Sequence, residues 1–305
     1  PTVFVYGEEV GVWGGGYNVT QGLLDKYGPM RVIDTPISEA LIGGAAVGAS
    51  ITGSRPVVDF MYQDFLGIAM DQIVNQAAKN RYMFGGKNAL PIVYRAAFGA
   101  GIGNAAQHTQ SLEAWFTHVP GLKVVAPSNA YDAKGLLKSA IRDPNPVVFL
   151  ENELLYGRSF DVPVLDDFTI PIGKANILRE GTDVTLVAFS ISVDYALQAA
   201  DTLATEGISA EVIDLRSLRP LDTETIVNSV KKTNRIVSVE EGWPACGIGS
   251  EIAAVIMEQA FDHLDAPLSR ICGADVPMPY AANLEKLALV TTAEVMTAAK
   301  SVLYR

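Results

Sequence analysis

The stretch RVIDTPISEALIGGAAVGASITGSRPVVDFM, residues 31–61, decides the fold class. It holds a strand-like run at Arg31–Asp34, a long apolar helical pattern that opens at Glu39, and a second β-branched run at Pro56–Met61. Two parallel strands need a crossover connection, and that crossover is usually a helix. The stretch therefore predicts one strand–helix–strand unit of a parallel sheet with covering helices.

The same alternation extends along the first half of the chain. Further strand-like runs lie at Val3–Tyr6, Pro91–Arg95, Leu122–Ala126 and Pro146–Glu151. After Tyr156, turn-forming and charged residues continue to Pro171 and predict a linker at 158–171. We therefore expect a first domain at 1–157 and a second domain at 172–305.

A second alternation follows the linker. Strands are expected at Val184–Ala188, Glu211–Leu215, Ile236–Val239 and Ser269–Cys272, and helices at Val193–Glu206, Asp222–Lys232 and Gly249–Asp262. Asp222 is the expected N-cap of its helix, because acidic residues continue into the first turn. The predicted class is α/β, with a parallel-sheet domain followed by a smaller α/β domain.

Composition excludes several kinds of partner. The chain of 305 residues has 23 basic and 34 acidic residues, a net charge of -11 that repels both nucleic acid and an anionic membrane surface. The longest stretch without charge, Ala96–Leu112, is broken by polar residues and glycines and predicts no membrane span. Two cysteines, Cys246 and Cys272, are too few for a disulfide framework and favour a reducing compartment.

A glycine-rich run, Gly99–Ala106, follows a strand and precedes a helical pattern, which is the context of a dinucleotide fingerprint. The next strand, however, ends in Pro127-Ser128-Asn129 and not in an acidic residue that could bind a ribose hydroxyl. A nucleotide-dependent oxidoreductase is therefore a weak alternative. His108 follows the glycines at the expected carboxyl ends of the strands, as either a structural group or a proton-transfer group.

Glu39 begins the apolar helix of the opening stretch and allows two interpretations. A first-turn carboxylate can simply stabilise the helix N-terminus. A carboxylate in an apolar setting can also have a raised pKa and share a proton with a ligand nitrogen. The residues alone leave both interpretations open.

The sequence resembles, over essentially its whole length, the beta subunits of thiamine-diphosphate-dependent 2-oxo acid dehydrogenase E1 components. The resemblance rests on ordered landmarks: Gly7–Gly11, Thr35–Glu39, Ala105–Gln110, Pro120–Val125, Asp132–Leu137, Asn145–Val147, Glu151–Gly157, Glu240–Pro244 and Asp275–Ala281. Glu151–Glu153 and Asp275–Tyr280 are most similar to pyruvate enzymes. Asp64–Ile68 and Tyr82–Lys87 are also similar to acetoin dehydrogenase beta chains.

The resemblance implies a transketolase-like pyrimidine-binding domain followed by a transketolase C-terminal domain. It implies that Glu39 hydrogen-bonds the aminopyrimidine ring of thiamine diphosphate and that His108 assists the reaction and the reductive acylation of lipoamide. It implies a pyrimidine pocket lined by Glu8, Ile37, Met61 and Phe65. It also implies a structural potassium site at Ile92, Ala140, Ile141, Asp143 and Asn145, in a loop where Pro144 departs from the family pattern.

The family's magnesium- and diphosphate-binding motif, a GDG followed at a distance by Asn, does not occur in this sequence. The resemblance assigns that half of the site to an alpha subunit, and implies an α2β2 heterotetramer that passes its acyl group to a lipoyl-bearing acyltransferase E2.

Pyruvate is the expected 2-oxo acid, and acetoin is the alternative substrate. A different class of function is a non-catalytic scaffold subunit that docks E2. The compartment expected from the family is the bacterial cytoplasm or the mitochondrial matrix.

Overall fold

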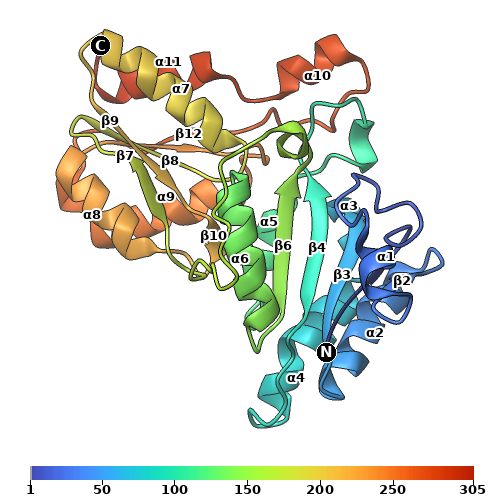
Figure 1. The fold of residues 1–305 in the computed structure, drawn as a ribbon. Coiled ribbons are helices and arrows are strands. Elements are labelled where there is room, and N and C mark those ends of the chain that lie inside the picture. Colours follow the sequence, from blue (N-terminus) through green and yellow to red (C-terminus); the bar gives the residue numbers. More distant parts are fainter. Residues whose placement is uncertain (1) are drawn as a thin grey trace.

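A computed structural model describes residues 2–305 and contains two β-sheets, each covered by helices (Figure 1). The first sheet has seven strands in the order β10-β5-β6-β4-β3-β1-β2. These are β1 (Val3–Gly7), β2 (Val32–Asp34), β3 (Arg55–Tyr62), β4 (Val93–Phe98), β5 (Lys123–Val125), β6 (Val147–Asn152) and β10 (Ser217–Arg219). All neighbours are parallel except β10 and β5. Every residue of the central strand β4 is buried, as expected for a parallel sheet with both faces covered.

Helices and helical turns connect these strands. They are α1 (Leu23–Tyr27), α2 (Glu39–Ile51), α3 (Gln63–Leu66), the π-helical η1 (Gln72–Ala77), α4 (Ala78–Met83), η2 (Ala105–Gln107), α5 (Glu113–Thr117), α6 (Ala130–Arg142) and η3 (Glu153–Gly157). The small residues of α2 permit close packing, since a Cβ added at Gly43 would lie 2.9 Å from the Cβ of Ala69. The strand–helix–strand unit expected from residues 31–61 is therefore present as β2, α2 and β3.

The second sheet has five strands in the order β12-β11-β8-β9-β7. Its strands are β7 (Asn176–Arg179), β8 (Val184–Ala188), β9 (Ala210–Asp214), β11 (Ile236–Val239) and β12 (Ser269–Ile271). Its helices are α7 (Ser192–Thr205), α8 (Thr223–Thr233), α9 (Ile248–Gln259), η4 (Phe261–His263), α10 (Ala282–Ala288) and α11 (Thr292–Val302). Asp222 caps α8 by accepting from the backbone N–H of Thr225, which confirms the expected N-cap.

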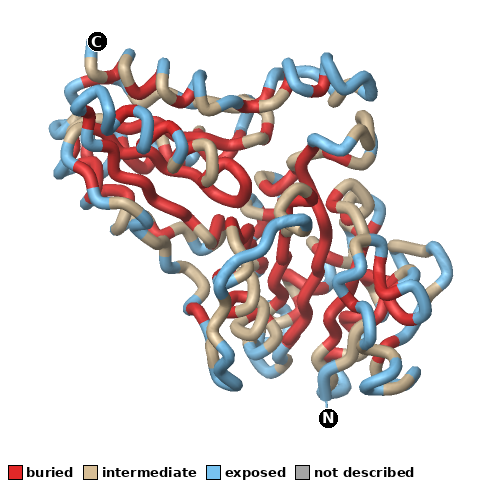
Figure 2. The backbone as a smooth tube through the Cα atoms, turned by 45° about the horizontal axis from the view of Figure 1, so that its top comes forward, coloured by how far each residue is buried: buried red, intermediate tan, exposed pale blue. Residues whose placement is uncertain are grey.

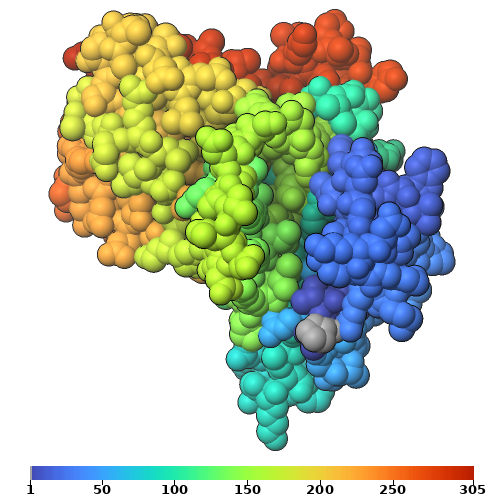
Figure 3. Space-filling view, in the orientation of Figure 1, coloured from blue at the N-terminus to red at the C-terminus, as the bar shows by residue number. Residues whose placement is uncertain are grey.

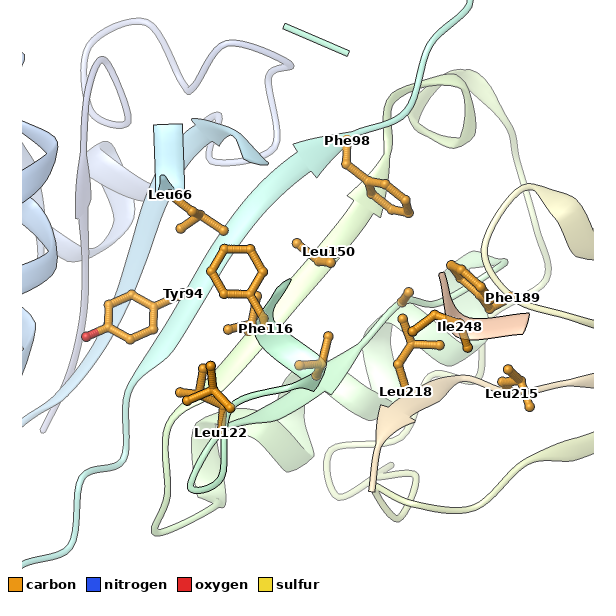
Figure 4. Packing of buried hydrophobic residues seen from close by; sticks show 14 of the residues in the cluster. Leu66, Tyr94, Phe98, Phe116, Leu122, Leu150, Phe189, Leu215, Leu218 and Ile248 are labelled. Atoms are coloured by element: carbon orange, nitrogen blue, oxygen red, sulfur yellow. The ribbon is translucent and has the colours of Figure 1, made fainter. Parts of the chain in front are cut away.

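The two halves of the chain share a hydrophobic core. Strand β10 leaves the second half and pairs antiparallel with β5 of the first sheet. Its Leu218 lies in one cluster with Phe98 and Phe116 of the first half and Leu215 and Ile248 of the second (Figure 4). The burial of the strands in both sheets is visible in Figure 2. The two sheets are thus packed as one body.

The segment between Gly157 and Asn176 contains no helix or strand. In Figure 3 this yellow-green segment lies across the front of the molecule, between the lobes of the two sheets. Lys134 and Ser139 of α6 donate to the carbonyls of Pro163 and Ile170 in this segment. The domain boundaries at 157 and 172 remain a prediction.

The structure confirms the α/β class and corrects three local expectations. The run Gly99–Ala106 is followed only by the three-residue turn η2, because Gly99, Gly101 and Gly103 have positive φ and the chain cannot enter a helix there. The helix expected to reach Asp262 ends at Gln259. The strands β7 and β10 were not expected. No helix within residues 2–305 is long and apolar enough to cross a membrane.

Candidate active site at the carboxyl edge of the first sheet

Four of the predicted site residues meet where parallel strands of the first sheet end. Glu8 follows β1, Glu39 begins α2 after β2, Met61 ends β3, and His108 lies in the loop after β4. Parallel strands place their carboxyl ends at one edge, and open α/β sheets bind ligands there. In Figure 1 this is the edge toward which the arrowheads of β4 and β6 point.

The short helix α3 surrounds His108 with aromatic rings. Met61 has a φ of 64°, a left-handed conformation that turns the chain out of β3 and into α3. The rings of Tyr62 and Phe65 contact the imidazole edge-to-face, with centroid distances of 5.1 and 5.3 Å. His108 and the predicted pocket residue Phe65 are therefore in contact.

The same helix fixes the chain that follows His108. Asp64 Oδ1 accepts from the side-chain amide of Gln110 at 2.7 Å and from its backbone N–H at 3.4 Å. The buried Gln63 accepts from the backbone N–H of Leu112 at 3.0 Å. Sequence reasoning missed Tyr62, Gln63 and Asp64, because nothing in a linear pattern shows that α3 packs on the loop of His108.

The two predicted carboxylates, Glu8 and Glu39, interact electrostatically. Burial raises the pKa of Glu8, and the charges of Glu39, Glu9 and Asp59 raise it further. Glu39 therefore lies close enough to Glu8 for its charge to disfavour ionisation of Glu8. A carboxylate with a raised pKa at a ligand-binding edge is typical of sites that exchange protons with a ligand.

A buried cluster of ion pairs joins the strands that end at this edge. Arg95 of β4 pairs with Asp59 of β3 and, at 2.5 Å, with Glu151 of β6, and it donates to the Tyr156 hydroxyl at 2.8 Å. Burial alone would lower the pKa of Arg95, but the two carboxylates more than offset it, so the guanidinium stays charged. The cluster ties three adjacent strands together beneath the site.

The site is an open edge in this chain. Ile37, a predicted pocket residue, is 79% exposed, and Leu41 of α2 and Ile68 after α3 are 62% and 58% exposed. Two cavities of about 740 and 590 Å³ lie elsewhere, between the two domains, and neither is lined by Glu39 or His108. The apolar wall expected of Ile37 is therefore not enclosed by this chain alone.

Two buried polar atoms beside the site lack partners among residues 2–305. They are Thr35 Oγ1, in the loop that leads to Glu39, and Asp64 Oδ2, beside the segment of His108. Unpartnered buried polar atoms are rare and call for a ligand or water. A hydroxyl and a carboxylate oxygen without partners, at an edge that also carries Met61 and Phe65, are the kinds of group that a polar heteroaromatic ring would engage.

The five predicted potassium residues are gathered at the opposite edge of the sheet, around the end of α6. Their oxygens already have protein donors: the carbonyl of Ile141 accepts from Arg55, Asn145 Oδ1 accepts from Arg81, and Asp143 pairs with Lys123. The carbonyls of Ile92 and Ala140 accept from backbone N–H groups. The potassium site therefore stays a prediction. Within residues 2–305, no cluster of His, Cys, Asp or Glu is arranged to bind a metal.

Comparison with known proteins identifies the class. Residues 1–158 match the family model "Transketolase, pyrimidine binding domain", and residues 173–295 match "Transketolase, C-terminal domain". The structure is similar to a solved "Split gene transketolase, inactive beta4 tetramer", with a TM-score of 0.80 and 26% identity, covering 100% of this chain and 92% of that one. The fold and its site edge are those of a two-domain transketolase-type protein.

The sequence relatives narrow this class to one family. The chain is 59% identical to "Pyruvate dehydrogenase E1 component subunit beta" of Rhizobium meliloti (strain 1021), covering 99% of this chain and 66% of that protein. It is also 59% identical to "Pyruvate dehydrogenase E1 component subunit beta-2, mitochondrial" of Oryza sativa subsp. japonica, covering 100% and 82%. The chain belongs to the family of pyruvate dehydrogenase E1 beta subunits, which confirms the expected family and fold.

Proposed function

We propose that this chain supplies the pyrimidine-binding half of a thiamine-diphosphate site that decarboxylates pyruvate and transfers the acetyl group to a lipoyl-bearing E2. The observation that carries the proposal is that Glu8, Glu39 and His108 all follow parallel strands at the carboxyl edge of the first sheet, with Glu8 and Glu39 close enough to interact, in a chain of this family. When bound, thiamine diphosphate supplies the electron sink for loss of carbon dioxide.

In this proposal, Glu39 hydrogen-bonds the aminopyrimidine and shares a proton with its ring nitrogen. Burial raises the pKa of the neighbouring Glu8, and the charge of Glu39 raises it further. Met61 and Phe65 exclude water from the ring, and His108 moves a proton at the acyl group or at the lipoyl sulfur. The position of these residues at or near the carboxyl edge of the first sheet supports the proposal.

We further propose that an alpha subunit closes the site in an α2β2 assembly and supplies the magnesium and diphosphate contacts. The exposed apolar side chains of Ile37, Leu41 and Ile68 beside the site support a covering partner, since exposed apolar groups of this kind mark interaction surfaces. The compartment that goes with this function is the bacterial cytoplasm or the mitochondrial matrix.

Acetoin is the second candidate substrate. The similarity of Asp64–Ile68 to acetoin dehydrogenase beta chains favours it, and this segment is the helix α3 that contacts His108. A substrate difference located in α3 would therefore act directly at the site. Pyruvate remains the first candidate because the similarity to pyruvate dehydrogenase beta subunits extends over the whole chain.

The variant Glu39→Gln tests the proposal. It replaces the carboxylate with an amide of the same shape, so assembly with the alpha subunit should be retained while decarboxylation falls by about 100-fold or more. The matched control is Glu258→Gln, at an exposed position of α9. Undiminished decarboxylation by the Glu39→Gln complex would favour the scaffold function and overturn the catalytic one.

A further inference from the structure

The glycine-rich loop Gly99–Asn104 leads directly to His108, and its backbone follows an unusual path. Gly99, Gly101 and Gly103 have φ values of 89°, 129° and 80°. Such conformations are open to glycine at little steric cost, but they leave the unrestrained loop with many alternatives. A residue at the end of this loop keeps one position only if the loop is held from outside.

A carboxylate from the second domain holds the loop. Glu285 of α10 accepts from the backbone N–H groups of Gly101 at 2.9 Å and Gly103 at 3.2 Å. Glu285 is only 4% exposed, and its hydrogen bond with Gly101 joins positions that are 184 residues apart in the sequence. A charged acceptor with two backbone donors forms stronger hydrogen bonds than a neutral group would.

Other polar groups lie beside the same loop. Asn152 donates to Glu241 at 2.6 Å directly beneath Gly99, where an added Cβ would lie 2.2 Å from Asn152 Nδ2. Burial raises the pKa of Glu153 to about 7; its hydrogen bond from Tyr17 opposes this rise, and the charge of Glu285 adds to it. Glu285 is the residue of α10 that hydrogen-bonds this loop.

We propose that Glu285 is a positioning residue that acts on His108 through the glycine-rich loop. The second domain thereby takes part in the chemistry of a site that lies on the first sheet. This inference rests on the proposed function of His108. Loss of the carboxylate removes two hydrogen bonds from the loop upstream of His108, where Asn104 still donates to Tyr62. The downstream end stays attached to Gln63 and Asp64.

The test uses the complex of this chain with its alpha subunit and compares Glu285→Ala, Glu285→Gln and the exposed control Glu258→Ala. We expect Glu285→Ala to lower kcat for pyruvate about 10- to 100-fold with little change in KM, because misplacement of a reacting group by about 1 Å has this effect. Glu285→Gln retains an acceptor oxygen and should restore most of the rate. Amide hydrogen exchange should become faster in residues 99–107 of Glu285→Ala and stay unchanged in α11.

A double variant separates positioning from a general structural effect. In a His108→Gln background, Glu285→Ala should cause no further loss of rate, because its effect passes through the imidazole. If Glu285→Ala lowered the rate of the His108→Gln variant as much as it lowers the rate of the natural chain, the proposal would be contradicted. Unchanged amide hydrogen exchange of the loop in Glu285→Ala would also contradict it, where His108→Gln alone is inactive. Full activity of His108→Gln itself would instead overturn the proposed function of His108, and this inference with it.

Discussion

Asp64 is the residue that fixes the chain immediately after His108. Its Oδ1 accepts both hydrogen bonds from Gln110, so its loss should let the imidazole drift between Tyr62 and Phe65. We predict that Asp64→Ala lowers turnover by about 10-fold, whereas Asp64→Asn keeps an acceptor oxygen and most of the rate. Steady-state kinetics of the assembled complex measure this, and equal losses in both variants would show that hydrogen bonding to Gln110 is not the cause.

Glu113 gives the molecule a pH-dependent stability. Burial, followed by the charge of Glu240, raises its pKa to about 8 from the ordinary value of 4.5. The folded state therefore holds a proton that the unfolded state releases, so the stability that this proton contributes is complete below pH 4.5 and is lost as pH rises through about 8.

We predict that Glu113→Gln, which stays neutral at every pH, melts about 2 °C higher than the natural chain at pH 8.5, with a smaller difference at pH 5.5. Thermal melts of the complex at the two pH values measure this, with Glu258→Gln as an exposed control. A difference of the same size at both pH values would contradict the account of Glu113.

The sequence predicted some site residues and not others, for a physical reason. Strand order along the chain places Glu39 and His108 at one edge of a parallel sheet. Their roles came from the family resemblance, because the residues alone left both interpretations open. Asp64 and Glu285 contact the loop of His108 only because α3 and α10 fold against it. Such contacts depend on tertiary packing, which no local pattern contains.

At the scale of elements, β10 connects the two halves of the molecule. It is three residues long and is followed by Pro220, so its sequence is typical of a turn. It forms a strand because it pairs with β5, which is distant in the sequence. By contrast, β8 and β11 were predicted with their observed bounds, because continuous β-branched runs identify buried strands.

We predict that Leu218→Ala in β10 lowers the free energy of unfolding by about 2–5 kcal/mol, because a fully packed leucine leaves a cavity in the core shared by both domains. Denaturant unfolding measures the loss. The matched control is Leu165→Ala, at a leucine that is 61% exposed and should change stability by less than about 0.5 kcal/mol. Equal effects of the two variants would mean that β10 contributes little to the shared core.

At the scale of the whole molecule, the fold brings the site together and leaves it open. The shared core and the ionic cluster of Arg95 hold the first sheet rigid, while Ile37 and its exposed apolar neighbours have no cover in this chain. The alternation of strands and helices predicted two α/β domains, and the family resemblance predicted a partner subunit.

The most direct test of the account is a turnover assay of the chain co-expressed with its alpha subunit. Reduction of an artificial acceptor would be followed with pyruvate, branched 2-oxo acids and acetoin in parallel, with and without thiamine diphosphate. We predict turnover of pyruvate that requires both subunits and the cofactor. A stable cofactor-bound heterotetramer that turns over none of these substrates, or acetoin alone, would contradict the proposed function.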